Sequence, residues 1–391
     1  MNHQIQEISG VHLFNLKIAR EFYDNSQPIT ALDFDGTGEY CVTASADETI
    51  NLYNCRTGNH GKFSVSKKYG VHLTRFTHSN TEIVYASTKE NDTLRYLSLR
   101  DNQFIRYFVG HKSRVVALEM SPINDQFLTG SINEGVRLWD LRQPNEIGFI
   151  DIQSGRPCVG YDPSGLIFAI ALQHSDKTIQ LHDVRKFNET PFSTFKIEEE
   201  NYNMNIDMDT NVNNDNDNNN DNNNNDNNNN NTLNWTGLKF SNDGQKILIN
   251  TSGDVHYIMD AFDGNLKQRL IGHAGLDNAS SFLGGEESCF TPDGRYVISG
   301  SKDGKIYFWD ISNSNNNNNN ESTTITTAES LTTEESMTMK PFHMLNHHTL
   351  PTQVIKFNPN KLLLVSACTD LVFWLPSLNT NELGETEMQL N

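Results

Sequence analysis

The chain has 391 residues and a formal net charge of −19, and 36% of its residues are hydrophobic. The excess of acid lies in three segments: residues 198–231 hold nine acidic residues, residues 312–337 hold four and residues 377–391 hold three. Without these segments the rest of the chain is close to neutral, at about −3. A nearly neutral core excludes non-specific nucleic-acid binding through a basic patch.

The five cysteines are scattered along the chain, and no two of them form a CxxC pair. This odd set predicts reduced, mostly buried thiols in an intracellular protein rather than a disulfide framework. The N-terminal residues lack a basic region followed by an apolar run, so we expect no secretion signal. No apolar run reaches the roughly 18 residues that a membrane span needs, so we expect no membrane association.

Seven short hydrophobic segments end in a similar way at a recurring interval. In chain order they are INLYN, LRYLS, VRLWD, IQLHD, HYIMD, IYFWD and LVFWL, which end at residues 54, 98, 140, 183, 260, 310 and 375. The intervals are 44, 42, 43, 77, 50 and 65 residues, and the two longest contain Asn-rich tracts. Without the tracts, the intervals approach the forty-odd residues of a WD repeat, in which four strands form one blade of a β-propeller.

The predicted strands fall into seven groups, separated by turns rich in Gly, Pro, Asp and Asn. The predicted blades span residues 31–68, 72–109, 115–151, 157–197, 235–271, 288–345 and 353–375. The last blade has only three strands, and a spare strand, residues 16–22, precedes the first. Pairing this strand with residues 371–375 closes the ring and removes two free sheet edges. The sequence therefore predicts an all-β fold, a seven-bladed WD40 β-propeller closed by an N-terminal strand.

We expect the propeller to occupy residues 8–376 and to carry two disordered Asn-rich inserts. Residues 201–231 are rich in Asn and Asp, and residues 312–337 are rich in Asn, Thr and Ser. Neither segment has enough apolar residues to offset the entropy of ordering, and the same holds for the acidic tail at residues 377–391.

Blades 3 and 6 each combine a His, a Ser, an Asn or Asp and a Trp, a set that could suggest a catalytic triad. The residues are His111, Ser131, Asn133 and Trp139 in blade 3, and His273, Ser301, Asp303 and Trp309 in blade 6. Because the set recurs from blade to blade, we interpret it as the structural hydrogen-bond network of WD repeats, in which the buried Trp N–H finds a partner. The sequence predicts no catalytic residue.

The histidines at positions 343, 347 and 348 could suggest a metal site, but no nearby Cys or paired carboxylates complete one. We expect them in a solvated loop, and we expect neither a metal nor a cofactor. An enzyme with its active site in the channel would need acids or histidines from several inner strands. The predicted inner strands are apolar or carry single charges, which argues against this class of protein.

Several longer stretches go beyond the general WD pattern. They are SKKYGV (66–71), FTHSN (76–80), DTLRYLSLRDNQFIRYFVGH (92–111), YDPSGLIFA (161–169), WTGLKFSNDG (235–244), DAFDG (260–264) and FWLP (373–376). Together they resemble the Swd2 family, the WD-repeat subunits of COMPASS-type histone H3 lysine-4 methyltransferase complexes. The resemblance covers about residues 13–376, apart from the two inserts and the long loop at 273–288.

The resemblance implies a nuclear, non-catalytic scaffold that joins a SET-domain methyltransferase subunit and other COMPASS subunits. For fungi it also implies a place in the mRNA cleavage and polyadenylation factor, with roles in transcription termination and 3′-end formation. Animal relatives imply a link to a nuclear protein-phosphatase-1 complex and to the phosphorylated tail of RNA polymerase II. A propeller adaptor of another assembly, such as a ubiquitin ligase, is the alternative.

Propellers commonly bind partners on the face that carries the loops between blades. On that face we expect one cationic patch, made of residues from three neighbouring loops: Lys67, Lys68, Tyr69, His72, Lys112, Arg114 and Arg156. Arg and Lys suit an acidic or phosphorylated peptide, and Tyr69 could anchor it. The alternative is that these are ordinary solvated loop residues.

Overall fold

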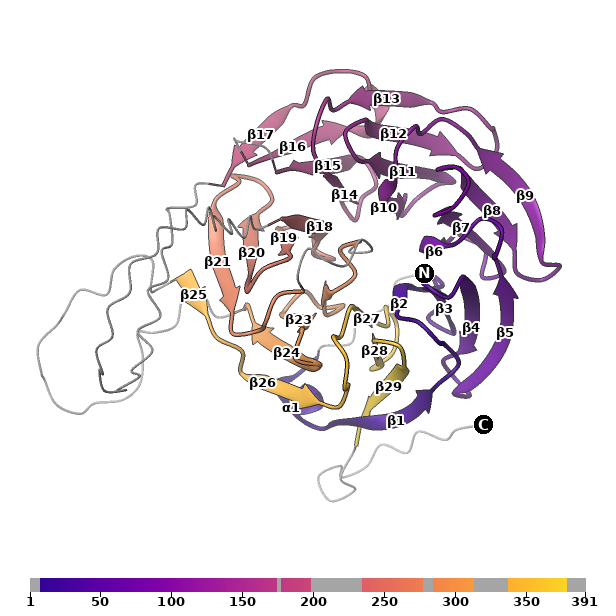
Figure 1. The fold of residues 1–391 in the computed structure, drawn as a ribbon. Helices are drawn as coiled ribbons and strands as arrows, with labels where there is room; N and C mark the ends of the chain where they lie inside the picture. The colour runs from indigo at the N-terminus through magenta and orange to yellow at the C-terminus, as the bar shows by residue number, and fades with distance from the viewer. Residues whose placement is uncertain (1–7, 174–176, 198–233, 277–283, 313–336, 378–391) are drawn as a thin grey trace, which may run out of the picture.

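The computed structural model describes residues 8–173, 177–197, 234–276, 284–312 and 337–377. Seven sheets surround a central channel and form a ring (Figure 1). In each sheet the strands follow one another from the channel outward, apart from the two exceptions described below. The predicted seven-bladed propeller is confirmed.

The first four blades each contain four antiparallel strands. Blade 1 consists of β2 (Ile29–Phe34), β3 (Tyr40–Ser45), β4 (Thr49–Asn54) and β5 (Asn59–Val65). Blade 2 consists of β6 (His72–Phe76), β7 (Glu82–Ala86), β8 (Leu94–Ser98) and β9 (Gln103–Phe108). Blade 3 consists of β10 (Val115–Met120), β11 (Gln126–Ser131), β12 (Gly135–Asp140) and β13 (Gly148–Asp151). Blade 4 consists of β14 (Pro157–Tyr161), β15 (Ile167–Leu172), β16 (Thr178–Asp183) and β17 (Ser193–Lys196), with a 3-10 turn, η1 (Val184–Lys186), after β16.

The last three blades depart from this plan at two places. Blade 5 consists of β18 (Trp235–Phe240), β19 (Lys246–Thr251), β20 (Val255–Asp260) and β21 (Leu266–Ile271). Blade 6 consists of β22 (Ser288–Phe290), β23 (Tyr296–Gly300), β24 (Lys305–Asp310) and β26 (His343–Asn346). Blade 7 consists of β27 (Val354–Phe357), β28 (Leu364–Ala367) and β29 (Leu371–Pro376), and its fourth strand is β1 (Leu16–Phe22).

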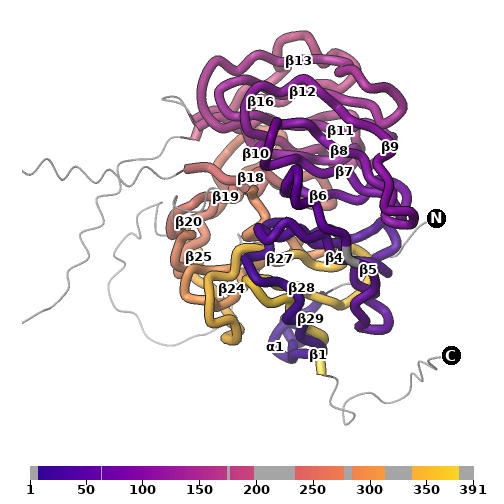
Figure 2. The backbone as a smooth tube through the Cα atoms, turned by 45° about the vertical axis from the view of Figure 1, so that its right-hand side comes forward, coloured from indigo at the N-terminus to yellow at the C-terminus, as the bar shows by residue number. Residues whose placement is uncertain are grey.

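The N-terminal strand closes the ring as predicted. It pairs antiparallel with β29, from Leu16 opposite Pro376 to Phe22 opposite Leu371. The short helix α1 (Gly10–Phe14) comes before it and buries Leu13 against blades 6 and 7. Both views place β1 beside β29 at the outer edge of the ring (Figures 1 and 2). Both ends of the propeller thus meet in one blade, which removes two free sheet edges.

A short fifth strand, β25 (Thr338–Met339), is the departure that the sequence did not predict. It pairs in parallel with the outer strand of blade 5, with Arg269 opposite Thr338, before the chain returns to blade 6 as β26. Figure 1 shows β25 beside β21. The outer edge of blade 5 is therefore partly covered by the protein's own chain.

The hydrophobic core lies mainly between neighbouring blades. One cluster joins Phe108 of blade 2 to Phe127 and Trp139 of blade 3. Five of the six residues of β11 are buried, whereas only Phe108 is buried in the outer strand β9. Burial on both faces explains why the inner strands appear in the sequence as nearly continuous apolar runs.

Two sequence expectations need comment. The outer strand of blade 1 was expected at residues 63–68, but it ends at Val65, because the N–H groups of Tyr69 and Gly70 both donate to the carbonyl of Ser66 and turn the chain.

The segments expected to be disordered lie outside the described residues: they are 201–231, nearly all of 312–337 and nearly all of the tail. Among the helices that the structure describes, none has the length and apolar character needed to cross a membrane.

Candidate partner-binding surface

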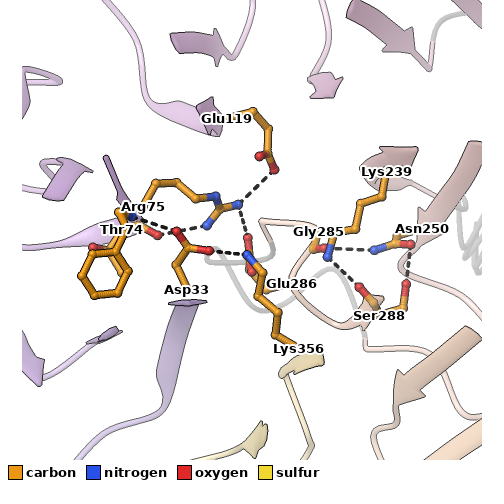
Figure 3. Close-up of polar contacts among 11 residues, drawn as sticks. Asp33, Thr74, Arg75, Glu119, Lys239, Asn250, Gly285, Glu286, Ser288 and Lys356 are labelled. Atoms are coloured by element: carbon orange, nitrogen blue, oxygen red, sulfur yellow. Dashed lines mark hydrogen bonds and ion pairs between the residues drawn. The ribbon is translucent and has the colours of Figure 1, made fainter. Parts of the chain in front are cut away.

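Charged side chains from five innermost strands meet in the central channel (Figure 3). They are Asp33 of β2, Arg75 of β6, Glu119 of β10, Lys239 of β18 and Lys356 of β27. Arg75 Nη2 lies 3.2 Å from Glu119 Oε1, and Lys356 pairs with Asp33. Each charge stands alone in its own strand, so no local pattern in the sequence indicates that they converge.

The end of the long loop between blades 5 and 6 also enters the channel. Glu286 pairs with Arg75 of blade 2, and its backbone carbonyl accepts a 2.8 Å hydrogen bond from the N–H of Ile355 in blade 7. Asn250 Nδ2 donates to the carbonyl of Gly285 at 3.0 Å, and Lys239 Nζ donates to the carbonyl of Ser288 at 2.6 Å. Residues 284–288 therefore connect blades 2, 5 and 7 across the channel.

The side chains around Arg75 are closely packed. The hollow beside Arg75 has a volume of about 10 Å³, close to the lower limit for one water molecule. Burial opposes the ionisation of Glu286, but the charges of Arg75, Lys239 and Lys356 together outweigh it and lower the pKa of this carboxyl to about 2. Glu286 is thus ionised and paired at neutral pH, which is the behaviour of a structural ion pair and not of a general acid.

The predicted WD network of blade 3 forms, but on a different residue. Trp139 Nε1 donates to Thr129 Oγ1 at 2.8 Å, and His111 Nε2 lies 2.7 Å from the same oxygen. Ser131 instead donates to the carbonyl of Ser113, and the side chain of Asn133 accepts from the N–H of Gly155. Thr129 and Ser131 face the same side of β11, because side chains alternate along a strand, and the nearer one meets the Trp.

In blade 6 the four predicted residues do not form one network around Trp309, although Ser301 hydrogen-bonds to Asp303. Trp309 Nε1 donates to the backbone carbonyl of Ile271 at 3.1 Å, Ser301 hydrogen-bonds to the backbone of Ala274, and Asp303 accepts from Tyr307. The ring of His273 packs on the edge of Trp309, with ring centroids 5.6 Å apart.

The reason lies in the neighbouring blade. His256 of blade 5 stacks on His273 with a centroid distance of 4.3 Å, and its Nε2 lies 2.9 Å from Ser299 Oγ. Ser299 holds the position that Thr129 holds in blade 3, since each lies two residues beyond the strand residue opposite the Trp. His256 therefore occupies Ser299, which by comparison with His111 and Thr129 of blade 3 would be the partner of His273.

Blade 7 contains a network like that of blade 3, in which a Trp and a His share one hydroxyl group. Trp374 Nε1 donates to Ser366 Oγ at 2.8 Å, and His348 Nε2 lies 2.7 Å from the same oxygen. The expectation of a solvated loop was wrong for His348, which is only 6% exposed. Burial, with the charge of His347 adding to it, lowers the pKa of His348 to about 4.

The predicted cationic patch divides into two parts. His72 is buried, and burial lowers its pKa to about 3, with the charges of Arg114 and Arg156 acting in the same direction. These three residues therefore gather near the inner ends of their blades. Lys67, Lys68 and Lys112 are exposed, as a surface for partners requires.

Tyr69 belongs to a cluster that the sequence analysis missed. The guanidinium carbon of Arg95 lies 3.4 Å from the centroid of the Tyr69 ring, and the rings of Phe104 and Tyr107 lie 5.5 and 5.1 Å from it. Lys68 Nζ lies 5.1 Å from the centroid of the Tyr69 ring. An arginine in the middle of β8, followed by two aromatic residues in the next strand, was the available signal.

The cysteines and acids offer no further reactive group in the part of the chain that the structure describes. Burial raises the pKa of Cys158 to about 12 and that of Cys289 to about 11, so both thiols stay protonated. No group of three or more His, Cys, Asp or Glu side chains within the described ranges could hold a metal ion.

Comparisons with known proteins agree with this architecture. The family model described as "WD domain, G-beta repeat" matches residues 16–54, 102–140 and 264–310. WD repeat-containing protein 82 of Drosophila melanogaster is 37% identical over 93% of this chain and 95% of its own length. COMPASS component SWD2 of Saccharomyces cerevisiae is 33% identical over 78% of this chain and 84% of its own length.

A third relative, Set1 complex component swd2 of Schizosaccharomyces pombe, is 30% identical over 88% of this chain and 92% of its own length. The alignments therefore extend over the whole ring and not over single repeats. The resemblance found in the sequence is confirmed: the chain belongs to the Swd2 family of WD-repeat proteins.

Proposed function

We propose that this protein is a non-catalytic scaffold subunit of a COMPASS-type complex that methylates histone H3 at lysine 4 in the nucleus. The observation that supports the proposal most is the near-complete alignment with two fungal relatives whose names place them in the COMPASS and Set1 complexes. The channel supports the non-catalytic role, because its charges are paired with one another across the blades.

The partners that we propose are the SET-domain methyltransferase subunit and other COMPASS subunits. We extend the proposal to subunits of the cleavage and polyadenylation factor and to the phosphorylated tail of RNA polymerase II. The exposed cations Lys67, Lys68 and Lys112 suit an acidic or phosphorylated segment of such partners. The loop that carries Lys67 and Lys68 is fixed to blade 2, because the backbone N–H groups of Thr88 and Lys89 donate hydrogen bonds to the carbonyl of Tyr69.

The test is affinity purification of the tagged protein from its own cells, followed by mass spectrometry. We expect a SET-domain methyltransferase and its subunits among the purified proteins, together with a decrease in histone H3 lysine-4 methylation when the protein is depleted. A tagged version lacking residues 1–24, which we expect not to close the ring because β1 is missing, serves as the negative control. Recovery of ubiquitin-ligase subunits without a methyltransferase would replace the proposal with the adaptor alternative.

A further inference from the structure

Blades 2 and 3 carry an arginine at the same position of their third strand. Arg95 of β8 lies opposite Tyr85 and Tyr107, and Arg137 of β12 lies opposite Thr129 and Phe149. In both blades an aromatic ring of the outer strand packs against the guanidinium. Arg137 lies 4.3 Å from the ring of Phe149, and Arg95 lies 5.1 Å from the ring of Tyr107. The two arginines therefore hold equivalent positions, and their surroundings can be compared directly.

In blade 3 the arginine is neutralised by the protein itself. Arg137 Nη2 lies 2.5 Å from Glu134 Oε1, and its Nη1 pairs with Glu146. Burial opposes the ionisation of Glu134, but the hydrogen bonds from Arg137, from the backbone N–H of Lys112 and from His111 together outweigh it and lower the pKa of this carboxyl to about 2. A guanidinium that is 7% exposed is thus matched with two carboxylates, as a buried charge requires.

In blade 2 the same guanidinium is more buried and has no carboxylate. Arg95 is 3% exposed, and its Nε donates to Ser87 Oγ at 2.8 Å. Throughout the described part of the chain, no Asp or Glu side chain forms an ion pair with it. Asp92 precedes Arg95 by three residues, as Glu134 precedes Arg137, but it forms no ion pair with Arg95, and the rings of Phe104 and Tyr107 lie beside the guanidinium instead. A buried cation without an anion is costly unless an anion arrives from outside.

The loop whose Tyr69 ring covers Arg95 has a fixed backbone. The N–H groups of Thr88 and Lys89 donate to the carbonyl of Tyr69 at 3.0 and 2.8 Å. Gly70 follows with φ +69°, and a Cβ at that position would lie 1.9 Å from Thr88 Oγ1, so only glycine allows this close approach. The backbone of this loop is therefore fixed before a ligand binds, and only the ring of Tyr69 has to turn aside for a carboxylate to reach Arg95.

Exposed apolar side chains surround the site on the outer strand of blade 2. Phe104 is 37% exposed and Tyr107 is 45% exposed, while Ile105 and Val109 reach 46% and 73%. We call Tyr69, Arg95, Phe104 and Tyr107 the blade 2 aromatic surface. Exposed apolar residues around one buried arginine are the composition found at the centre of protein–protein contacts.

We propose that the blade 2 aromatic surface is a docking site for an acidic segment of a partner protein, in which one Asp or Glu carboxylate pairs with Arg95 and apolar neighbours pack on Phe104 and Tyr107. We propose a carboxylate as the ligand because of charge complementarity. The equivalent arginine of blade 3, Arg137, forms ion pairs with two carboxylates. A doubly charged phosphate is commonly bound by a group of arginines, whereas this surface offers one, whose planar fork matches a carboxylate.

The first experiment selects peptides on the purified protein. A displayed library of seven-residue peptides carries a fixed central Asp, Glu, Asn or Gln, with the other positions randomised. We expect enrichment of the acids with apolar neighbours and not of the amides. The Arg95→Gln protein should bind the best peptide more weakly, with a Kd roughly tenfold higher or more. A hydrogen bond to a charged group contributes about that factor to affinity. Arg142→Gln is the matched control, since it removes an exposed arginine of blade 3 whose partner is Asp140.

The second experiment supplies the carboxylate from within the chain. Phe104→Glu puts an acid beside Arg95, where the ring of Phe104 now lies, and Phe104→Gln removes the same ring without adding charge. We expect Phe104→Glu to bind none of the selected peptides and to melt at a higher temperature than Phe104→Gln. This pair also decides the question if Arg95→Gln does not fold.

Three results would overturn the proposal. One is equal enrichment of amides and acids, or no enrichment over the Arg95→Gln protein. Another is an identical melting temperature for Phe104→Glu and Phe104→Gln. The third is tighter binding when phosphoserine replaces the central acid in the selected peptide, which would make the surface a phosphopeptide site. None of these measurements depends on membership of a COMPASS-type complex.

Discussion

The channel and the rim of blade 2 each bury an arginine, and they treat it differently. Arg75 in the channel is 4% exposed and pairs with Glu119 and Glu286, while Arg95 at the rim is 3% exposed and packs on aromatic rings. Equal burial therefore does not imply an equal role. A buried charge whose counter-charges lie within the chain holds the structure together, and one whose counter-charge is missing is available to a partner.

The largest effect is expected from the substitution Arg75→Gln. It leaves Glu286 without the cation that keeps it ionised in the channel, and breaking a buried ion pair in this way costs about 3–5 kcal/mol of unfolding free energy. Arg95→Gln should cost about 1 kcal/mol, since it removes cation–π contacts but uncovers no acid. Chemical denaturation of both proteins measures the difference, and equal losses would contradict the comparison.

A change of pH separates the channel from the histidine networks. The pKa of Glu286 is about 2, so the channel pairs persist at pH 5, whereas the pKa of His348 is about 4, below the ordinary value of 6.5. The unfolded chain then binds a proton at this histidine between pH 6.5 and 4 that the folded chain does not bind. Stability is therefore full above pH 6.5 and falls as the pH decreases towards 4.

For His348 alone the loss between pH 7 and pH 5 is roughly 2 kcal/mol. The buried His72, with a pKa of about 3, adds to the total in the same direction. Denaturation curves of the wild-type protein and of His348→Gln at the two pH values isolate the contribution of His348. The variant should lose less stability on acidification, and a parallel loss in both proteins would show that His348 is accessible to protons in the fold.

The ring and its closure could be predicted from the sequence, because both follow from repetition. The spacing of the strand endings gave the number of blades, and the spare strand at residues 16–22 had one vacant position to fill. The contacts between blades could not be predicted in this way. Arg75 and Glu286 are 211 residues apart, and His256 meets Ser299 only because blades 5 and 6 pack side by side.

The network serine shows a smaller error of the same origin. Ser131 fits the pattern as well as Thr129 does, and the choice between them depends on which side chain lies nearer to Trp139 across the pair of strands. To decide which of the two hydroxyl groups contacts Trp139, one must know the register of β11 against β12, and the local sequence does not specify it. Arg95 was overlooked for a related reason. What distinguishes it is that no carboxylate of the described residues pairs with it, and this depends on how the neighbouring strands pack.

The smallest effect on stability is expected from the exposed cations of the loop face. Lys67 and Lys112 have exposed side chains, so Lys67→Glu together with Lys112→Glu should change the unfolding free energy by less than about 0.5 kcal/mol. The same double variant reverses two charges on the face proposed to receive an acidic or phosphorylated partner. We therefore expect weaker association with the methyltransferase subunit, and a steeper weakening at low salt, where exposed charges are screened least.

The matched control reverses two exposed lysines elsewhere on the ring, Lys17 at the start of the closing strand and Lys340 between β25 and β26. Both double variants change the net charge by the same amount, so a general effect of charge would weaken association equally in the two. Pull-down at two salt concentrations, with melting curves to verify folding, distinguishes the cases. Loss of association only in the Lys67 and Lys112 variant assigns the cationic loops to partner binding. Full association would show that Lys67 and Lys112 do not contribute to partner binding.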